Sequence, residues 1–130
     1  MTVVLDSWAV LRYLEGEGSA ADAVEHLLER DRPAMSWLNL GEVHYVLARR
    51  HGDAEATEAV RDLEAVLDVR LPEADVVLAA ARIKARLPMA YADAFTAATA
   101  LDRDAELWTG DPELLVPGAA WRWRDLRPSG

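Results

Sequence analysis

The 130-residue chain has no cysteine, a single lysine and no long apolar run. Without cysteine there is no disulfide, no thiolate nucleophile and no cysteine-based zinc site. No apolar stretch approaches the roughly 20 residues that span a bilayer, and the N-terminus lacks the basic and apolar regions of a secretory signal. We therefore expect a cytoplasmic protein that is not associated with a membrane.

Positive charge is also scarce, because 23 acidic residues outnumber 14 basic ones and give a formal net charge of −9. This balance argues against general affinity for nucleic acid, which normally requires a basic surface. The objection weakens if several acids are metal ligands, because two divalent cations would raise the net charge from −9 to −5 and reverse the local field. Hydrophobic residues make up 52% of the chain, which predicts one globular domain over residues 1–130.

Short apolar segments alternate with segments of helical periodicity along the chain. The pattern predicts strands at residues 3–5, 34–36, 68–71 and 106–109, and an edge strand at 121–124. It predicts helices at 7–15, 19–30, 37–50, 53–67 and 73–87, and a last one that begins near residue 91 or 93 and runs to 103, with Ser19 as the N-cap of the second. Strands alternating with helices favour an α/β fold with a parallel sheet.

Two acids directly follow predicted strands. Asp6 comes after residues 3–5, and Asp111 comes after residues 106–109 and Gly110. In open α/β sheets, ligands bind beyond the carboxyl ends of the strands, so both carboxylates are candidates for one site. Each also has a structural alternative, because Asp6 can cap the helix after it, and Asp111 followed by Pro112 is typical of a helix start.

Two further acids lie within predicted helices. Glu42 falls on or beside an apolar stripe formed by Leu38, Val43, Val46 and Leu47, and a buried glutamate costs several kcal/mol unless it is paired or binds metal. The alternative is a salt bridge to an arginine, or a side chain tilted to the rim. Asp93 lies in the first turn of an apolar helix, where the helix dipole and capping would also favour it.

In a compact α/β sheet these four acids can converge on one pocket. Two bare charges about 4 Å apart at an effective dielectric near 20 repel by about 4 kcal/mol. Such a cluster is tolerated if some acids stay protonated or if hard cations fill it, and oxygen-only ligands suit Mg²⁺ or Mn²⁺. Carboxylate clusters that hold two such ions hydrolyse phosphodiester bonds.

The chain resembles the PIN domain, and more narrowly the VapC-type toxins of bacterial toxin–antitoxin pairs. The resemblance covers almost the whole chain and is carried by segments 3–7, Ser36 with Glu42 six residues later, 91–100 and 109–111. It implies a three-layer α/β/α sandwich with a mostly parallel central sheet of four to five strands. It also implies a metal-dependent endoribonuclease in which water activated by Mg²⁺ or Mn²⁺ hydrolyses RNA.

The resemblance assigns the acidic cluster to Asp6, Glu42, Asp93 and Asp111, with Asp6 and Asp93 as the expected direct metal ligands. Ser7 and Thr109 match hydroxyl positions that hold a ligand water, a carboxylate or a phosphate oxygen. Asn39 matches a small polar position. The departure from the family pattern is Leu114, where an aromatic residue is common, and Glu113 is expected to be a solvated first-turn residue.

The resemblance also implies partners, namely an RNA substrate, a small VapB-like antitoxin and a second copy of the chain in a homodimer. Four aromatic residues either line an antitoxin groove or lie in the core: Trp8, Tyr13, Trp37 and Tyr45. The three histidines, at positions 26, 44 and 51, are expected at the surface or in packing. Two alternatives remain: a catalytically silent PIN-like module used for binding or scaffolding, and a phosphotransfer domain. The second lacks a second acid after Asp6 and a lysine at a strand end.

Overall fold

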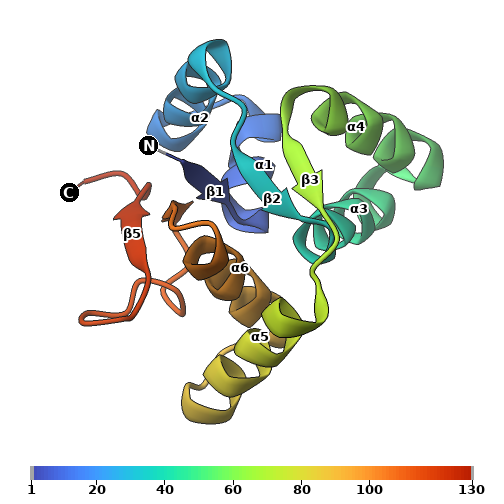
Figure 1. The fold of residues 1–130 in the computed structure, drawn as a ribbon. Helices are drawn as coiled ribbons and strands as arrows, with labels where there is room; N and C mark the ends of the chain where they lie inside the picture. The colour runs from blue at the N-terminus through green and yellow to red at the C-terminus, as the bar shows by residue number, and fades with distance from the viewer. Residues whose placement is uncertain (1, 130) are drawn as a thin grey trace.

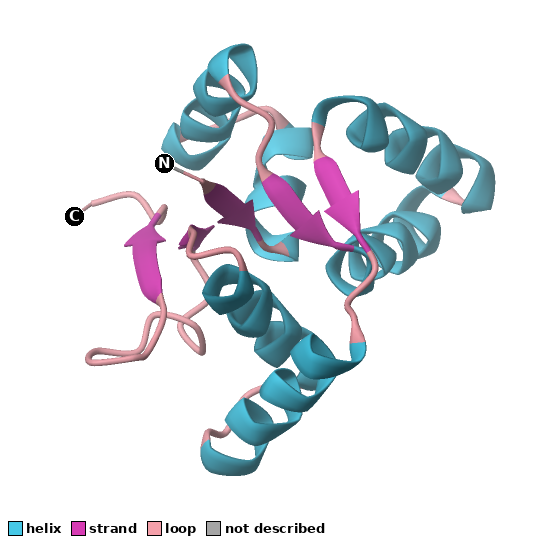
Figure 2. Ribbon diagram, in the orientation of Figure 1, coloured by secondary structure: helices cyan, strands magenta, loops and turns pink. Residues whose placement is uncertain are grey.

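Residues 2–129 of the computed structural model form five strands and six helices (Figures 1 and 2). In chain order the elements are β1 Val3–Leu5, α1 Ser7–Glu15, α2 Ser19–Arg30, β2 Ala34–Ser36, α3 Trp37–His51, α4 Asp53–Val66, β3 Asp68–Arg70, α5 Ala74–Arg86, α6 Tyr91–Asp102, β4 Glu106–Thr109 and β5 Arg122–Asp125. No helix within these described residues is long and apolar enough to cross a membrane.

All five strands are parallel, in the spatial order β3-β2-β1-β4-β5. β2 and then β3 are added on one side of β1, and β4 and then β5 on its other side. The strand order therefore reverses between β1 and β4. Leu5 pairs with Trp108 across this junction, which brings the next residues, Asp6 and Thr109, side by side. Crevices at such reversals are where open α/β sheets bind ligands.

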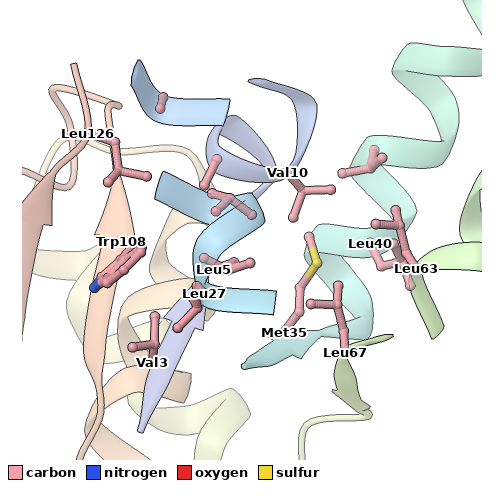
Figure 3. Close-up of a cluster of buried hydrophobic side chains, with 14 residues drawn as sticks. Val3, Leu5, Val10, Leu27, Met35, Leu40, Leu63, Leu67, Trp108 and Leu126 are labelled. Carbon is pink, nitrogen blue, oxygen red and sulfur yellow. The ribbon is translucent and has the colours of Figure 1, made fainter. Parts of the chain in front are cut away.

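Helices cover both faces of the sheet, which confirms the three-layer arrangement. Val3 and Leu5 of β1 point to one face and join a core with residues of α1 to α4, whereas Val4 points to the other face and packs with α5 and α6. This alternation is the period of two of a strand buried on both sides. Figure 3 shows Leu5, Met35 and Leu67 with their neighbours in the first core.

The predicted strands and helices are confirmed to within one or two residues, with three corrections at helix boundaries. Gly18, not Ser19, is the N-cap of α2, and α3 continues to His51. No helix follows Asp111: its Oδ1 accepts from the Glu113 N–H at 2.9 Å, but residues 112–114 form only a turn. The capping geometry is present, and Pro117 and Gly118 end the segment before a helix can extend.

The buried face of α3 differs from the predicted stripe. Leu38 is 42% exposed, whereas Leu40 and Val43 are fully buried together with Asn39. Positions 40, 43 and 47 also satisfy helical spacing. Leu40 and Val43 pack into the first core with Met35 of β2 and Leu63 of α4, and this packing selects the second stripe. Val66 of α4 and Leu78 of α5 are also exposed.

Candidate active site at the β1–β4 junction

Asp6 is 1% exposed, and each of its two carboxylate oxygens has a different partner. Oδ1 accepts from the Ala9 N–H at 2.8 Å and caps α1, while Oδ2 accepts from the hydroxyl of Thr109. The pKa of Asp6 is raised to about 7, mainly by burial and also by the charges of Asp111 and Glu42, while the two hydrogen bonds oppose the rise. The predicted cap is therefore confirmed, and the same side chain also faces other acids.

Thr109 connects Asp6 to the segment that carries Asp111. Its hydroxyl donates to Asp6 and accepts from the Asp111 N–H at 2.9 Å. Thr109 is completely buried at the end of β4. Its hydroxyl therefore links Asp6, which directly follows β1, to the loop that follows β4. The structure thus places the Thr109 hydroxyl against a carboxylate, which is one of the contacts expected for this position.

Replacing Thr109 with valine is expected to destabilise the protein by about 2–4 kcal/mol, because Asp6 Oδ2 and the Asp111 N–H both lose a buried partner. The loss of the hydroxyl also raises the pKa of Asp6 further above its usual range. Urea unfolding measures the stability. Thr99→Val is the matched control, because Thr99 donates only to the Phe95 carbonyl one turn earlier in α6. A T109V midpoint equal to that of T99V would contradict this role.

Glu42 is half-buried on α3, and its Oε1 accepts a hydrogen bond from the hydroxyl of Ser7 in the first turn of α1. No arginine pairs with it among the described residues, so the salt-bridge alternative is wrong. The half-buried position agrees with the rim alternative. Ser7 and Glu42 thus join α1 to α3 on the side of Asp6.

Asp93 lies in the first turn of α6 and is 7% exposed. It does not cap the helix, since the N-cap is Ala90 and makes no side-chain bond there. Burial first, and then the charges of Asp111, Glu113, Glu42 and Asp6, raise the pKa of Asp93 to about 8. Repulsion from all the other acids shows that Asp93 shares one electrostatic environment with them.

Asn39 ties α3 to the start of α6. Its Nδ2 donates to the Ala92 carbonyl at 2.9 Å, directly before Asp93, and the side chain is 1% exposed. Its Oδ1 is buried and has no hydrogen-bond partner among the described residues. A buried unpaired amide oxygen costs about 1–3 kcal/mol, which indicates a site built for a donor such as water.

The donor set suits a hard cation. Within residues 2–129 no three acidic or histidine side chains are grouped closely enough to hold a metal ion by themselves. Mg²⁺, however, is usually bound by one or two carboxylates and keeps several waters. Every candidate ligand here carries oxygen, and the acids that raise one another's pKa lack a counter-charge among them. The residues therefore fit a hydrated Mg²⁺ or Mn²⁺ ion.

Two contacts at this site have little signal in the sequence. Gly110 is buried beneath the indole of Trp8, and a Cβ atom at position 110 would overlap the indole ring. Glu113 is exposed, yet its Oε2 accepts from the Ala90 N–H at 3.0 Å and ties the loop after β4 to the start of α6. In the sequence, the contact between Gly110 and Trp8 is indicated only by the glycine between Thr109 and Asp111.

Gly110→Ala is expected to destabilise the protein by about 1–3 kcal/mol, because the added methyl group must displace the Trp8 ring. Gly41→Ala is the matched control. Nothing lies within 4 Å of a Cβ at position 41 in α3, so this change is expected to stabilise by about 0.5–1 kcal/mol. Urea unfolding of both variants checks the opposite signs, and a stabilising G110A would overturn the packing argument.

The remaining sequence candidates are aromatic residues, histidines and Leu114. Trp8, Tyr13 and Trp37 pack partly buried against the first core, and Tyr45 is 46% exposed beneath Arg49. His26 is exposed, His44 contacts Thr57 at 3.3 Å and His51 lies 3.8 Å from Glu55. The histidines are thus surface or packing residues, as predicted. Leu114 is fully buried in the second core.

A family model described as the PIN domain matches residues 3–117. No curated protein sequence matches the chain. Among solved structures, VapBC-1 from nontypeable Haemophilus influenzae is 21% identical with a TM-score of 0.77, over 97% of this chain and 98% of the matched chain. DNA-bound VapBC from Salmonella typhimurium is 18% identical with a TM-score of 0.76, over 98% and 99%.

A third structure, VapC20 from Mycobacterium tuberculosis, is named as a toxin that cleaves the sarcin-ricin loop. It is 22% identical with a TM-score of 0.71, over 90% of this chain and 95% of the matched chain. At these identities the likeness shows a common fold. The five-stranded parallel sheet flanked by helices is therefore an arrangement shared with VapC structures.

Proposed function

The chain belongs to the PIN domain family, and from that premise we propose that it is a Mg²⁺- or Mn²⁺-dependent endoribonuclease, the toxin of a toxin–antitoxin pair. The observation that carries the proposal is the raised pKa of two buried aspartates, Asp6 and Asp93, each caused in part by other acids at one edge of the sheet. Buried carboxyl groups whose pKa values are raised by specific charged neighbours are candidates for functional residues. VapC20, similar in fold, is named for cleaving an RNA loop.

In this proposal Asp6 and Asp93 would hold the ion directly, and Glu42 and Asp111 would be the further acids of the site. When bound, a divalent ion supplies an activated water and offsets the negative charge that develops on the phosphate. The protein's own residues provide the positions: Thr109 orients Asp6, Ser7 orients Glu42 and Asn39 holds the backbone before Asp93. These hydrogen bonds, one buried and two partly buried, orient the groups that would hold the ion.

The direct test is cleavage of a labelled, structured RNA by the purified chain with Mg²⁺, with Mn²⁺ and with EDTA. Cleavage is expected with either ion and is expected to stop with EDTA. The products are expected to carry 5′-phosphate and 3′-hydroxyl ends, because water attacks the phosphate and the 3′-oxygen leaves. Cleavage that continues in EDTA would overturn the metal-dependent mechanism.

We further propose that a small VapB-like antitoxin holds the chain inactive and that the chain forms a homodimer. The support is the fold shared with chains of VapBC complexes. An antitoxin arginine would be attracted to a site in which Asp6, Glu42, Asp93 and Asp111 repel one another. Co-expression with the reading frame next to this gene, followed by co-purification, tests the pair.

A second candidate is a catalytically silent PIN-like module that binds or scaffolds. It is favoured by the absence, within the described residues, of three acidic side chains grouped to hold an ion. Under this alternative millimolar Mg²⁺ would give no thermal stabilisation, whereas an occupied site stabilises the folded state by RT ln(1 + [L]/Kd). The two functions therefore separate in a melting experiment that needs no RNA.

A further inference from the structure

A pocket of about 280 Å³ lies between the second half of α5 and the loop that precedes β5. Arg82 and Arg86 of α5 stand at its sides, and Leu87, Val116 and Trp121 contribute apolar walls. Its volume is near the lower end of small-molecule sites, about 300 Å³, so it has room for one planar ring system. We call it the α5 pocket.

The α5 pocket is formed by the two longest acid-free segments of a strongly acidic chain. Residues 76–92 and 114–124 contain no aspartate or glutamate, although the chain has 23 of them. The first segment carries Arg82, Lys84 and Arg86, and none of these three has an ion-pair or hydrogen-bond partner among the described residues. By contrast, Arg12, Arg70 and Arg122 are each paired with an acid. The free positive charge beside an apolar wall suits an anionic ligand with a flat apolar part.

The first of these segments also contacts the loop that carries Asp111. The Ala90 N–H donates to Glu113 at 3.0 Å, so the α5–α6 loop and the loop after β4 are in contact beside Asp93 and Asp111. Leu87 precedes Asp93 by six residues, which limits their separation to about 22 Å even for extended chain. A nucleic acid strand that passes the acids therefore reaches the pocket within a few nucleotides.

We propose that the α5 pocket binds a nucleotide of the RNA strand a few positions from the cleaved bond, with its base on the apolar wall and its phosphates on Arg82 and Arg86. This inference rests on the proposed function, because it assumes that RNA lies across the acids. It explains how a chain of net charge −9 holds a polyanion: attraction is local and separate from the acidic site. Arginine forks match phosphate oxygens, and bases bind apolar side chains without a strict sequence requirement.

The test measures binding of a fluorescein-labelled, single-stranded 12-nucleotide RNA by anisotropy, in the D93N full-length chain with Mg²⁺ so that the strand stays intact. The double variant R82Q/R86Q is expected to bind about tenfold more weakly or worse, and to reduce the slope of log affinity against log salt by about 1.4. The control R49Q/R50Q removes the same charge from α3 and is expected to change affinity by less than about threefold. Equal losses of RNA affinity in R82Q/R86Q and R49Q/R50Q would overturn the proposal that the α5 pocket binds RNA.

A second variant tests the base without changing charge. Ala120→Leu fills the exposed rim of the α5 pocket and is expected to weaken RNA binding by about fivefold or more, while leaving a strand of the same length without bases unaffected. An equal effect on both strands would overturn the nucleotide assignment in favour of a simple polyanion or acidic-peptide surface.

Failure of the nuclease proposal gives a different result. If the unsubstituted chain cuts no RNA but RNA binding still depends on Arg82 and Arg86, the binding role of the α5 pocket is supported and the nuclease proposal is contradicted. If the chain cuts RNA and R82Q/R86Q binds and cuts RNA like R49Q/R50Q, the binding role of the α5 pocket is contradicted and the nuclease proposal is supported. Melting curves of each variant confirm folding, which exposed arginines are expected to leave intact.

Discussion

Asp93→Asn is expected to reduce RNA cleavage by a factor of about 10³ while making the metal-free protein more stable at pH 8. The loss of activity follows from removing a charge that would hold the ion and oppose the charge on the phosphate. The gain in stability follows from the environment of Asp93, where burial and four neighbouring acids raise its pKa to about 8. A neutral amide of the same size avoids that repulsion. Cleavage assays and thermal melting in EDTA measure the two effects.

The opposite signs separate a functional acid from a structural one, since a structural residue would lose stability when it is replaced. Asp102→Asn is the matched control at the other end of α6, where the aspartate is exposed, and it is expected to leave cleavage unchanged. Cleavage by D93N within about threefold of the unsubstituted chain would contradict its role, because an essential electrostatic group contributes about 10²–10³.

Asp6→Asn is expected to lose cleavage as D93N does, but not to gain the same stability. The carboxylate of Asp6 accepts from both Ala9 and Thr109. An amide keeps one acceptor for the Ala9 N–H but turns an NH₂ group toward Thr109, so the Thr109 O–H loses the acceptor that Asp6 Oδ2 provides. Relief of repulsion is therefore offset by a lost hydrogen bond, and a D6N melting point clearly above that of D93N would contradict this geometry.

Three strands, β1, β2 and β4, were predictable because each is a short and largely buried segment that ends at a polar residue or a helix. The exposed β5 was predictable instead from its alternation of tryptophan and arginine. Val3–Leu5 is apolar on both faces and stops at Asp6, and Glu106–Thr109 stops at Gly110. The order in which they pair was not readable from periodicity, since β5 joins β4 in parallel through a loop without a helix. The helix expected after Asp111 failed for a related reason: local capping chemistry starts a turn, and only residues further on decide whether a helix continues.

The sequence proposes the candidate site as a set of residues, but it does not predict how the elements that carry them pack together. Strand ends placed Asp6 and Asp111 at one edge, but the stripe drawn through Leu38 gave the wrong buried face for α3. The link from Asn39 to Ala92 and the contact of Glu113 with Ala90 depend on how α3 and α6 pack, and spacing along the chain carries no information about that. The predicted roles of Asp6, Glu42, Asp93 and Asp111 in metal binding stay a prediction.

Mg²⁺ is expected to raise the melting temperature at pH 8 by about 10 °C when its concentration is 100 times Kd, since this excess contributes about 2.7 kcal/mol and 1 kcal/mol shifts a domain of this size by about 3–6 °C. The effect should shrink toward pH 5. The pKa values of Asp6 and Asp93 are about 7 and 8 in the folded protein, so at pH 5 both carboxyls hold protons that the ion must displace.

Without metal, the same two groups give a pH dependence of the opposite direction. The folded state keeps their protons to about pH 7 and 8, whereas the unfolded chain loses them near the ordinary value of 3.8. Their contribution to the free energy of unfolding is therefore complete below pH 3.8 and decreases as the pH rises to about 8. The stability difference between D93N and the unsubstituted chain in EDTA isolates the Asp93 part, and should grow from pH 5 to pH 8. A Mg²⁺ effect of equal size in D93N would contradict the role of Asp93 in holding the ion. No Mg²⁺ effect at pH 8, with NaCl of matched ionic strength as the control, would favour the silent binding module.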